Sequence, residues 1–180
     1  MCGIRPCEVT KMVRWLLSFA VVLSVGALSA STGGNGKSSA ACTPTRPSNP
    51  RFAPPTPYPH NAPDEMFWYG SDSLWTLLGI QGTWHVHRNV LEGRGGYTTK
   101  LVYWRQGFDS RKEVYPELRV VAKRLDRAAP AVHAGPANAV FVTGPTPAMM
   151  TVIDIPSPGC WELTAEYREH KLSFVVSVQP

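Results

Sequence analysis

The sequence lacks the motifs that mark the commonest enzyme classes. It contains no Gly-x-Ser-x-Gly, no His-Glu-x-x-His and no P-loop, so these hydrolase, zinc-protease and nucleotide-binding signatures are excluded. After residue 30 it also lacks an apolar period of three to four residues sustained over ten residues, which an amphipathic helix requires. The nearest contender, Glu113–Leu125, contains Pro116 and paired valines. We therefore expect an all-β protein without helices after its first thirty residues.

Charge of a single sign is also scarce. The chain carries 18 basic and 13 acidic residues. Removing the four charged residues among the first thirty, three basic and one acidic, lowers the net charge from +5 to +3. The basic residues around Lys123 and Arg124 are interrupted by Leu125 and Asp126, so they form no continuous stripe. This pattern argues against nucleic acid as a partner.

The first thirty residues resemble an export signal. Lys11 and Arg14 precede the fourteen-residue apolar run Trp15–Leu28, and small residues follow it at Ser29–Ser31. A positive flank, a short apolar run and a small-residue exit together predict a secretory signal peptide over residues 1–30. A retained membrane anchor is the alternative, although spanning hydrocarbon takes roughly 20 apolar residues.

The four cysteines divide into two pairs. Cys2 and Cys7 lie in the leader, and they leave the protein altogether if translation starts at Met12. Cys42 and Cys160 remain, an even number in an oxidising compartment, and we expect them to form a disulfide. The alternative is that the protein is a lipoprotein, in which the sulfur of Cys42 carries a lipid that anchors the chain to a membrane. The three residues before Cys42 match a lipoprotein signal poorly.

Proline and glycine set the expected domain boundary. Residues 31–63 are Gly/Ser-rich at first and then Pro-rich, with eight prolines between residues 43 and 63. Such composition predicts a linker that is flexible and then extended, with little capacity to pack. The folded domain is expected over residues 64–180.

Short strands separated by Pro/Gly turns are expected throughout that domain. Period-two alternation is clear in Leu118, Val120 and Ala122, and again in Trp161 and Leu163. About 7–9 such strands predict an antiparallel Ig-like β-sandwich. The last two strands should form a hairpin through residues 168–170, with an inner face made of Trp161, Leu163, Phe174 and Val176.

Three motifs occur in an order that resembles a known family. They are Trp68-Tyr69-Gly70-Ser71-Asp72-Ser73-Leu74-Trp75, Arg119–Asp126 and Pro158-Gly159-Cys160-Trp161-Glu162-Leu163-Thr164, and Leu172–Val176 follows them. The sequence resembles, over roughly residues 42–178, a bacterial family of exported or lipid-anchored proteins with an Ig-like domain. Ser71 and Lys123 depart from the family pattern, which has Asn and Arg there. The resemblance implies fold and export, and it implies no catalytic residue.

A metal site is the first candidate site. His85 and His87 lie on one face of an expected strand, roughly 7 Å apart, a spacing that allows chelation. No third ligand is fixed nearby by the sequence, and exposed strand histidines are the simpler interpretation. Asp64, Glu65 and Asp72 are the candidate carboxylates of a glycosidase, but Asp72 is better explained as a turn residue.

Adjacent aromatic residues form the second candidate site. Trp68 and Tyr69, and likewise Tyr103 and Trp104, are neighbours within expected strands. Because successive side chains of a strand point to opposite faces, one ring of each pair should face outward. The four rings together predict a partly exposed aromatic binding patch.

These observations lead to a functional expectation. We expect an exported, non-catalytic module at the cell envelope that serves adhesion, assembly or ligand binding, with no cofactor and with a protein or glycan as partner. Membrane contact is expected only through the leader or through lipid on Cys42. The alternative is a small envelope-associated enzyme or a metal-handling protein that uses His85 and His87.

Overall fold

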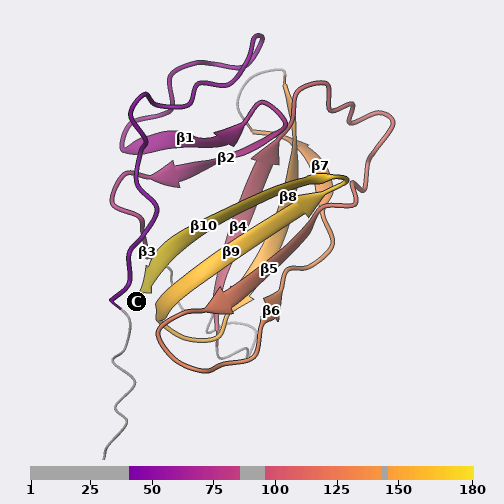
Figure 1. The fold of residues 1–180 in the computed structure, drawn as a ribbon. Coiled ribbons are helices and arrows are strands. Elements are labelled where there is room, and N and C mark those ends of the chain that lie inside the picture. Colours follow the sequence, from indigo (N-terminus) through magenta and orange to yellow (C-terminus); the bar gives the residue numbers. More distant parts are fainter. Residues whose placement is uncertain (1–40, 86–95, 143–145) are drawn as a thin grey trace, which may run out of the picture. The chain divides into compact units, whose positions relative to one another are not determined.

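The computed structural model describes residues 41–85, 96–142 and 146–180 (Figure 1). The predicted leader, the first part of the predicted linker and His87 lie outside these residues. Ten β-strands occur in the described part of the chain, and all of its regular secondary structure is β. It contains no helix that is long and apolar enough to cross a membrane.

The strands form two five-stranded sheets that face each other (Figure 1). The first sheet has the order β1 (Met66–Ser71), β2 (Leu74–Gly79), β4 (Tyr97–Trp104), β8 (Pro147–Ile155) and β7 (Asn138–Phe141). The second has the order β3 (Thr83–His85), β10 (His170–Gln179), β9 (Gly159–Tyr167), β5 (Arg119–Arg124) and β6 (Val132–His133). All pairs are antiparallel except β3 with β10, which is parallel.

The all-β, two-sheet architecture confirms the coarse prediction from the sequence. The number of strands exceeds the expected range by one, because the two-residue strand β6 carries no alternation that a sequence could reveal. The predicted final hairpin is present, with Tyr167 opposite His170 and Arg168 at φ +53° in the turn. The segment Glu113–Leu125, considered above as a helix, ends in strand β5 instead.

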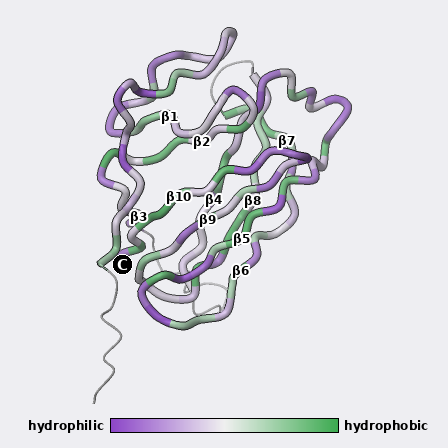
Figure 2. The backbone as a smooth tube through the Cα atoms, viewed as in Figure 1, coloured by the Kyte–Doolittle hydropathy of each residue, from purple (hydrophilic) through white to green (hydrophobic). Residues whose placement is uncertain are grey.

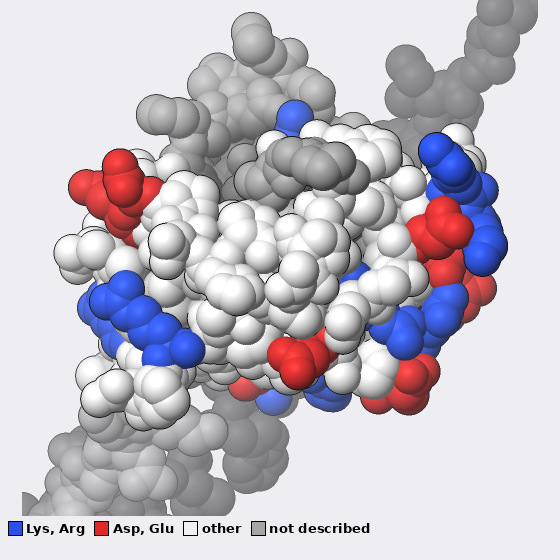
Figure 3. Space-filling view, turned by 90° about the horizontal axis from the view of Figure 1, so that it is seen from above, with Lys and Arg blue, Asp and Glu red and all other residues white. Residues whose placement is uncertain are grey.

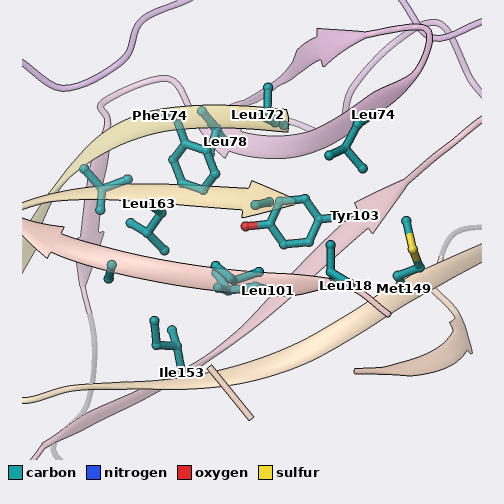
Figure 4. Close-up of a cluster of buried hydrophobic side chains, with 14 of the residues drawn as sticks. Leu74, Leu78, Leu101, Tyr103, Leu118, Met149, Ile153, Leu163, Leu172 and Phe174 are labelled. Atoms are coloured by element: carbon teal, nitrogen blue, oxygen red, sulfur yellow. The ribbon is translucent and has the colours of Figure 1, made fainter. Parts of the chain in front are cut away.

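The main core lies between the sheets. It consists of the side chains that point inward, which are those at every second position of each strand. Trp161, Leu163, Phe174 and Val176 are all buried there, as the alternation predicts. Figure 4 shows leucines, Ile153 and Tyr103 of both sheets converging on this layer. Figure 2 shows hydrophobic residues concentrated along the strands. Burial of this layer is the main source of stability for a sandwich.

A second, smaller core lies on the outer face of the first sheet, under residues 41–63. These residues, which we call the Pro-rich strap, contribute the buried Tyr58 and the partly buried Phe52. Both rings contact Trp75, with centroid distances of 4.9 Å for Tyr58 and 6.2 Å for Phe52. The expected linker up to Pro63 is therefore corrected: from residue 41 the chain packs as part of the folded unit.

The beginning of the strap is bound to the outer edge of β10. The backbone N–H of Thr45 donates to the carbonyl of Val175 at 2.8 Å, and the N–H of Val175 donates to Thr45 Oγ1 at 2.8 Å. Gly82 lies against Pro44, at φ +58°, and a Cβ there would collide with the Pro44 ring. Glycine is thus required at position 82, where the strap passes over the connection between β2 and β3.

The far part of the strap is held by a side chain. Tyr58 donates its hydroxyl hydrogen to the carbonyl of Arg105 at 2.8 Å, while its ring stands edge-on to Trp75. A buried tyrosine with both a packed ring and a satisfied hydroxyl is a strong local anchor. The strap therefore covers a face of the first sheet that would otherwise present indole rings to solvent.

Candidate binding site

Two of the three sequence motifs meet in one cluster around the buried guanidinium of Arg124. Its Nε and Nη2 donate to the carboxylate of Asp126 at 2.6 and 3.1 Å, Nη1 donates to Ser157 Oγ at 2.5 Å, and Nη2 also donates to the Pro158 carbonyl at 2.6 Å. The guanidinium carbon lies 5.4 Å from the centre of the Trp161 ring. Charge-assisted bonds of this kind are strong and directional. The cluster joins the end of β5 to the start of β9.

Gly159 makes this arrangement sterically feasible. It has φ +147°, and a Cβ at this position would lie 2.7 Å from Arg124 Cζ and 2.8 Å from Asp126 Oδ2. The hydrogen bonds from Arg124 lower the pKa of Asp126 below its ordinary value. The guanidinium donates its hydrogen bonds to Asp126, Ser157 and Pro158, so its role in this cluster is structural. The motif residues thus have a structural explanation.

The next residue of the same motif forms the disulfide. Cys160 is bonded to Cys42, with the two Cα atoms 5.4 Å apart and a sequence separation of 118. The predicted bridge is therefore present in the structure. A sulfur within a disulfide cannot carry a thioether lipid, so lipid attachment at Cys42 is incompatible with this bridge.

Of the predicted metal and carboxylate residues in the described part of the chain, Glu65 and His85 line one hollow of about 260 Å³. His85 is exposed at the end of β3, and His87 lies outside the described residues. Within the described stretches no group of three His, Cys, Asp or Glu side chains is close enough to hold a metal ion. Asp72 is exposed in the turn between β1 and β2. Glu65 and His85 are fewer than the three protein ligands of a typical zinc site, so the described residues alone do not complete one there.

The predicted exposed aromatic patch is wrong. The rings of each adjacent pair do point to opposite faces, as strand geometry requires. However, the outward-facing Trp68 and Trp104 are buried under the strap, in T-shaped contact at 5.2 Å, and Tyr103 is buried in the main core. Only Tyr69 stays partly exposed, and its hydroxyl donates to the Ser173 carbonyl. No local sequence pattern indicates that the strap covers this face.

An apolar slot forms instead where β2 and β4 separate. The two strands pair only at Trp75–Trp104 and Thr76–Tyr103. The hydroxyl of Thr76 donates to the Val102 carbonyl at 2.7 Å, and no residue of β2 after Thr76 pairs with β4. The resulting slot has a volume of about 370 Å³. This is within the range of small-molecule sites.

The slot reaches from the outer face of the first sheet to the main core. Leu77 and Leu78 line it from β2, and Leu101 and Val102 line it from β4. Phe174 of the opposite sheet lies at its inner end, next to Leu78 in the cluster of Figure 4. Its lining is thus largely hydrophobic, and part of it consists of residues that are almost fully buried.

One charged residue lies among the lining residues of the slot. Lys100 of β4 is exposed, and within the described residues it makes no ion pair. Sequence reasoning missed the slot because its walls read as ordinary strand residues. The divergence of two strands depends on the tertiary packing of both, and no local signal reports it.

A second hollow, of about 640 Å³, lies on the outer face of the second sheet. The strand register places Arg119 opposite Glu166 and Lys123 opposite Glu162, so residues of opposite charge face each other across its strands. Lys171 also contacts Glu166 at 2.9 Å, which lowers the Glu166 pKa. Opposite charges facing each other across strands stabilise the sheet. This surface is therefore less suited than the slot to recognise a ligand by charge.

Lys and Arg side chains lie beside Asp and Glu side chains on the face shown in Figure 3, so charges of both signs are mixed there. Comparison of the chain with protein-family models, curated proteins and solved structures returns no match. Function is therefore inferred from the geometry described above.

Proposed function

We propose that this protein is an exported Ig-like β-sandwich module that binds a ligand at the cell envelope and has no catalytic role. The observation that carries export is the Cys42–Cys160 disulfide. Structural disulfides persist in oxidising compartments and are rare where glutathione keeps thiols reduced. The signal-like composition of residues 1–30 supports the same location. The Ig-like type is supported by the motif resemblance and by two facing sheets built largely of antiparallel pairs.

Binding is supported by the apolar slot. It is the place in the described structure where hydrophobic side chains of both sheets, including Leu101 and Phe174, border an unfilled space next to an unpaired cation. Ligand sites are typically apolar clefts with a few polar groups that fix orientation. A glycan platform has less support, because stacking on sugars requires exposed ring faces and three of the four predicted rings are buried.

Export is tested with a fusion of the complete chain to a reporter enzyme that is active only outside the cytosol. The expected result is extracytoplasmic activity that disappears when residues 1–30 are removed. The same fusion with Lys11→Ala and Arg14→Ala tests the positive flank and should be exported less well. Activity confined to the cytosol, or export independent of residues 1–30, would contradict the proposal.

A further inference from the structure

We propose that the slot between β2 and β4 binds a single-chain amphiphile with an anionic head group, of the chemical class of a fatty acid. This inference rests on the binding role proposed above and specifies its ligand. The apolar chain occupies the slot between Leu77 and Val102, with its end toward Phe174. The head group stays at the outer opening, beside Lys100.

The lining of the slot favours an alkyl chain as the buried part of the ligand. Ten of the thirteen residues around it are apolar, and the polar ones are Thr76, Thr99 and Lys100. The hydroxyl of Thr76 is already used by the Val102 carbonyl. A peptide segment would bring its own backbone N–H and C=O groups against these walls, where few partners exist, and unpaired buried polar groups are costly. A hydrocarbon chain carries no such groups.

The depth of the slot gives the chain a favourable environment. Leu78, Leu101 and Phe174 are each at most 5% exposed, so the inner end of the slot belongs to the main core. Trp84 contacts Phe174 at 6.1 Å between ring centroids and closes the slot from β3. Protein interiors are normally packed to the density of organic crystals. Open space of this size beside core residues is unusual, and an apolar ligand that fills it removes apolar surface from water.

The charges around the opening favour an anionic head group. Lys100 is the charged residue of the slot lining and has no ion-pair partner within the described stretches. Asp154 is the acidic residue of β8; it lies diagonally from Lys100 in the strand register and accepts a hydrogen bond from Thr98. A carboxylate at the opening therefore finds a lysine whose ammonium group is available. Lys100 thus explains the preference for an anionic head group, and the apolar slot explains the preference for an alkyl chain.

Three ten-carbon probes separate these two contributions. Decanoate, decanol and decyltrimethylammonium are titrated into the disulfide-intact protein, below the micelle-forming concentrations of the two ionic probes and below the solubility limit of decanol. Binding is followed by calorimetry and by tryptophan fluorescence, since Trp84 and Trp104 border the slot. Decanoate should bind tightest, decanol about tenfold more weakly, the difference that one partly screened charge contact supplies, and the cationic probe weakest.

Two variants locate the contacts. Lys100→Ala should bring decanoate to within about twofold of decanol and leave decanol unchanged, whereas the matched control Lys123→Ala, on the outer face of the second sheet, should alter neither. Leu77→Trp, at a partly exposed position of the slot, should abolish binding of all three probes. Its thermal unfolding and near-ultraviolet circular dichroism establish that it is folded.

Equal affinity of decanoate and decanol, or an unchanged decanoate affinity in Lys100→Ala, would overturn the anionic preference. Binding that survives Leu77→Trp in a folded protein would overturn the slot as the site. If none of the probes binds the wild-type protein, the amphiphile inference is wrong. Export is tested separately by the reporter fusion, and the Cys42–Cys160 bridge is tested separately by the intact mass of the protein.

Discussion

At the scale of single residues, Arg124 and Gly159 depend on each other. The guanidinium occupies the space that any side chain at position 159 would need. In return, the carbonyl of Pro158 and the hydroxyl of Ser157 bind the guanidinium and fix the turn before β9. A buried charge is tolerated only when it is paired and hydrogen-bonded. The close approach of Gly159 is thus part of what keeps Arg124 paired.

Gly159→Ala should therefore lower the free energy of unfolding by more than backbone strain alone. A non-glycine residue in such a conformation costs about 1–3 kcal/mol, and the clash with Arg124 adds to it. Gly107→Ala is the matched control, because Gly107 also has a positive φ, +73°, but has no atom within 4 Å of the added Cβ. Urea unfolding of both variants makes the comparison. Equal losses would mean that Arg124 moves aside at no cost.

Trp161→Ala should lower the free energy of unfolding by about 3–5 kcal/mol, the usual range for emptying a buried indole site. Trp161 is fully buried, and its indole N–H donates to the Ser157 carbonyl at 3.2 Å. Val114→Ala, at a position 53% exposed, serves as the control and should change little. A loss of less than about 1 kcal/mol for Trp161→Ala would show that the inner face of β9 is not the dominant core surface.

At the scale of elements, the sequence predicts the strands well, but it predicts poorly which segments pack over their outer faces. Alternation places Trp161 and Leu163 inward because a strand that covers a core must alternate. The same rule correctly predicts that one ring of each adjacent pair faces outward, but it says nothing of what covers the outward rings, which are Trp68 and Trp104 in the structure. The strap's prolines remove backbone donors, which excludes regular pairing. They do not prevent Phe52 and Tyr58 from packing.

The slot illustrates the same limit from the opposite direction. Leu77 and Val102 read as ordinary strand residues, and pairing along the whole of β2 and β4 would be the simplest expectation. Instead, all six residues of β2 pair with β1, whereas pairing of β2 with β4 stops after Thr76. Strand separation is decided by competition between neighbours far apart in sequence. It is therefore accessible only from the structure.

Tyr58→Ala should loosen the strap and expose the indoles beneath it. The variant loses a ring that contacts Trp75 at 4.9 Å and the hydrogen bond to the Arg105 carbonyl. We expect an increase in acrylamide quenching of tryptophan fluorescence and a loss of about 3 kcal/mol in unfolding free energy. Tyr115→Ala, whose side chain is 80% exposed, is the control. Identical quenching in the two variants would show that the strap is not held by Tyr58.

At the scale of the whole molecule, buried ionisable groups set how stability depends on pH. Burial raises the pKa of Tyr103 far above its ordinary value, and burial together with Glu113 raises the pKa of Tyr167. Because the folded state disfavours the phenolates, stability is full below about pH 10 and falls as pH rises above it. The lowered pKa of Asp126 acts in the opposite range. It contributes stability above about pH 4, which is lost as pH falls.

Tyr103→Phe should be neutral or stabilising by about 1 kcal/mol at pH 7 and should reduce the alkaline loss of stability. The Tyr103 hydroxyl is buried and has no hydrogen-bond partner in the described part of the structure. Removing an unsatisfied buried hydroxyl eliminates its desolvation cost. Urea midpoints between pH 5 and 11 measure both effects. If the variant is less stable than the wild type at pH 7 and loses as much stability as the wild type at alkaline pH, the Tyr103 hydroxyl has a hydrogen-bond partner after all.

The Cys42–Cys160 disulfide closes residues 42–160 into one loop, with most of β9 and all of β10 outside it, and it joins the start of the strap to the start of β9. In the chain-entropy model a loop of 118 residues stabilises the folded state by about 4–5 kcal/mol through the unfolded ensemble. The intact mass of the exported protein should therefore lie about 2 Da below that of the reduced protein, the two hydrogens lost on forming the bridge, with no lipid mass. Cys42→Ala with Cys160→Ala should lower the urea midpoint and speed hydrogen exchange at the Thr45 amide, which donates to Val175. A Cys160 thiol that alkylates without reduction, or lipid on Cys42, would show that the strap is held by its non-covalent contacts alone.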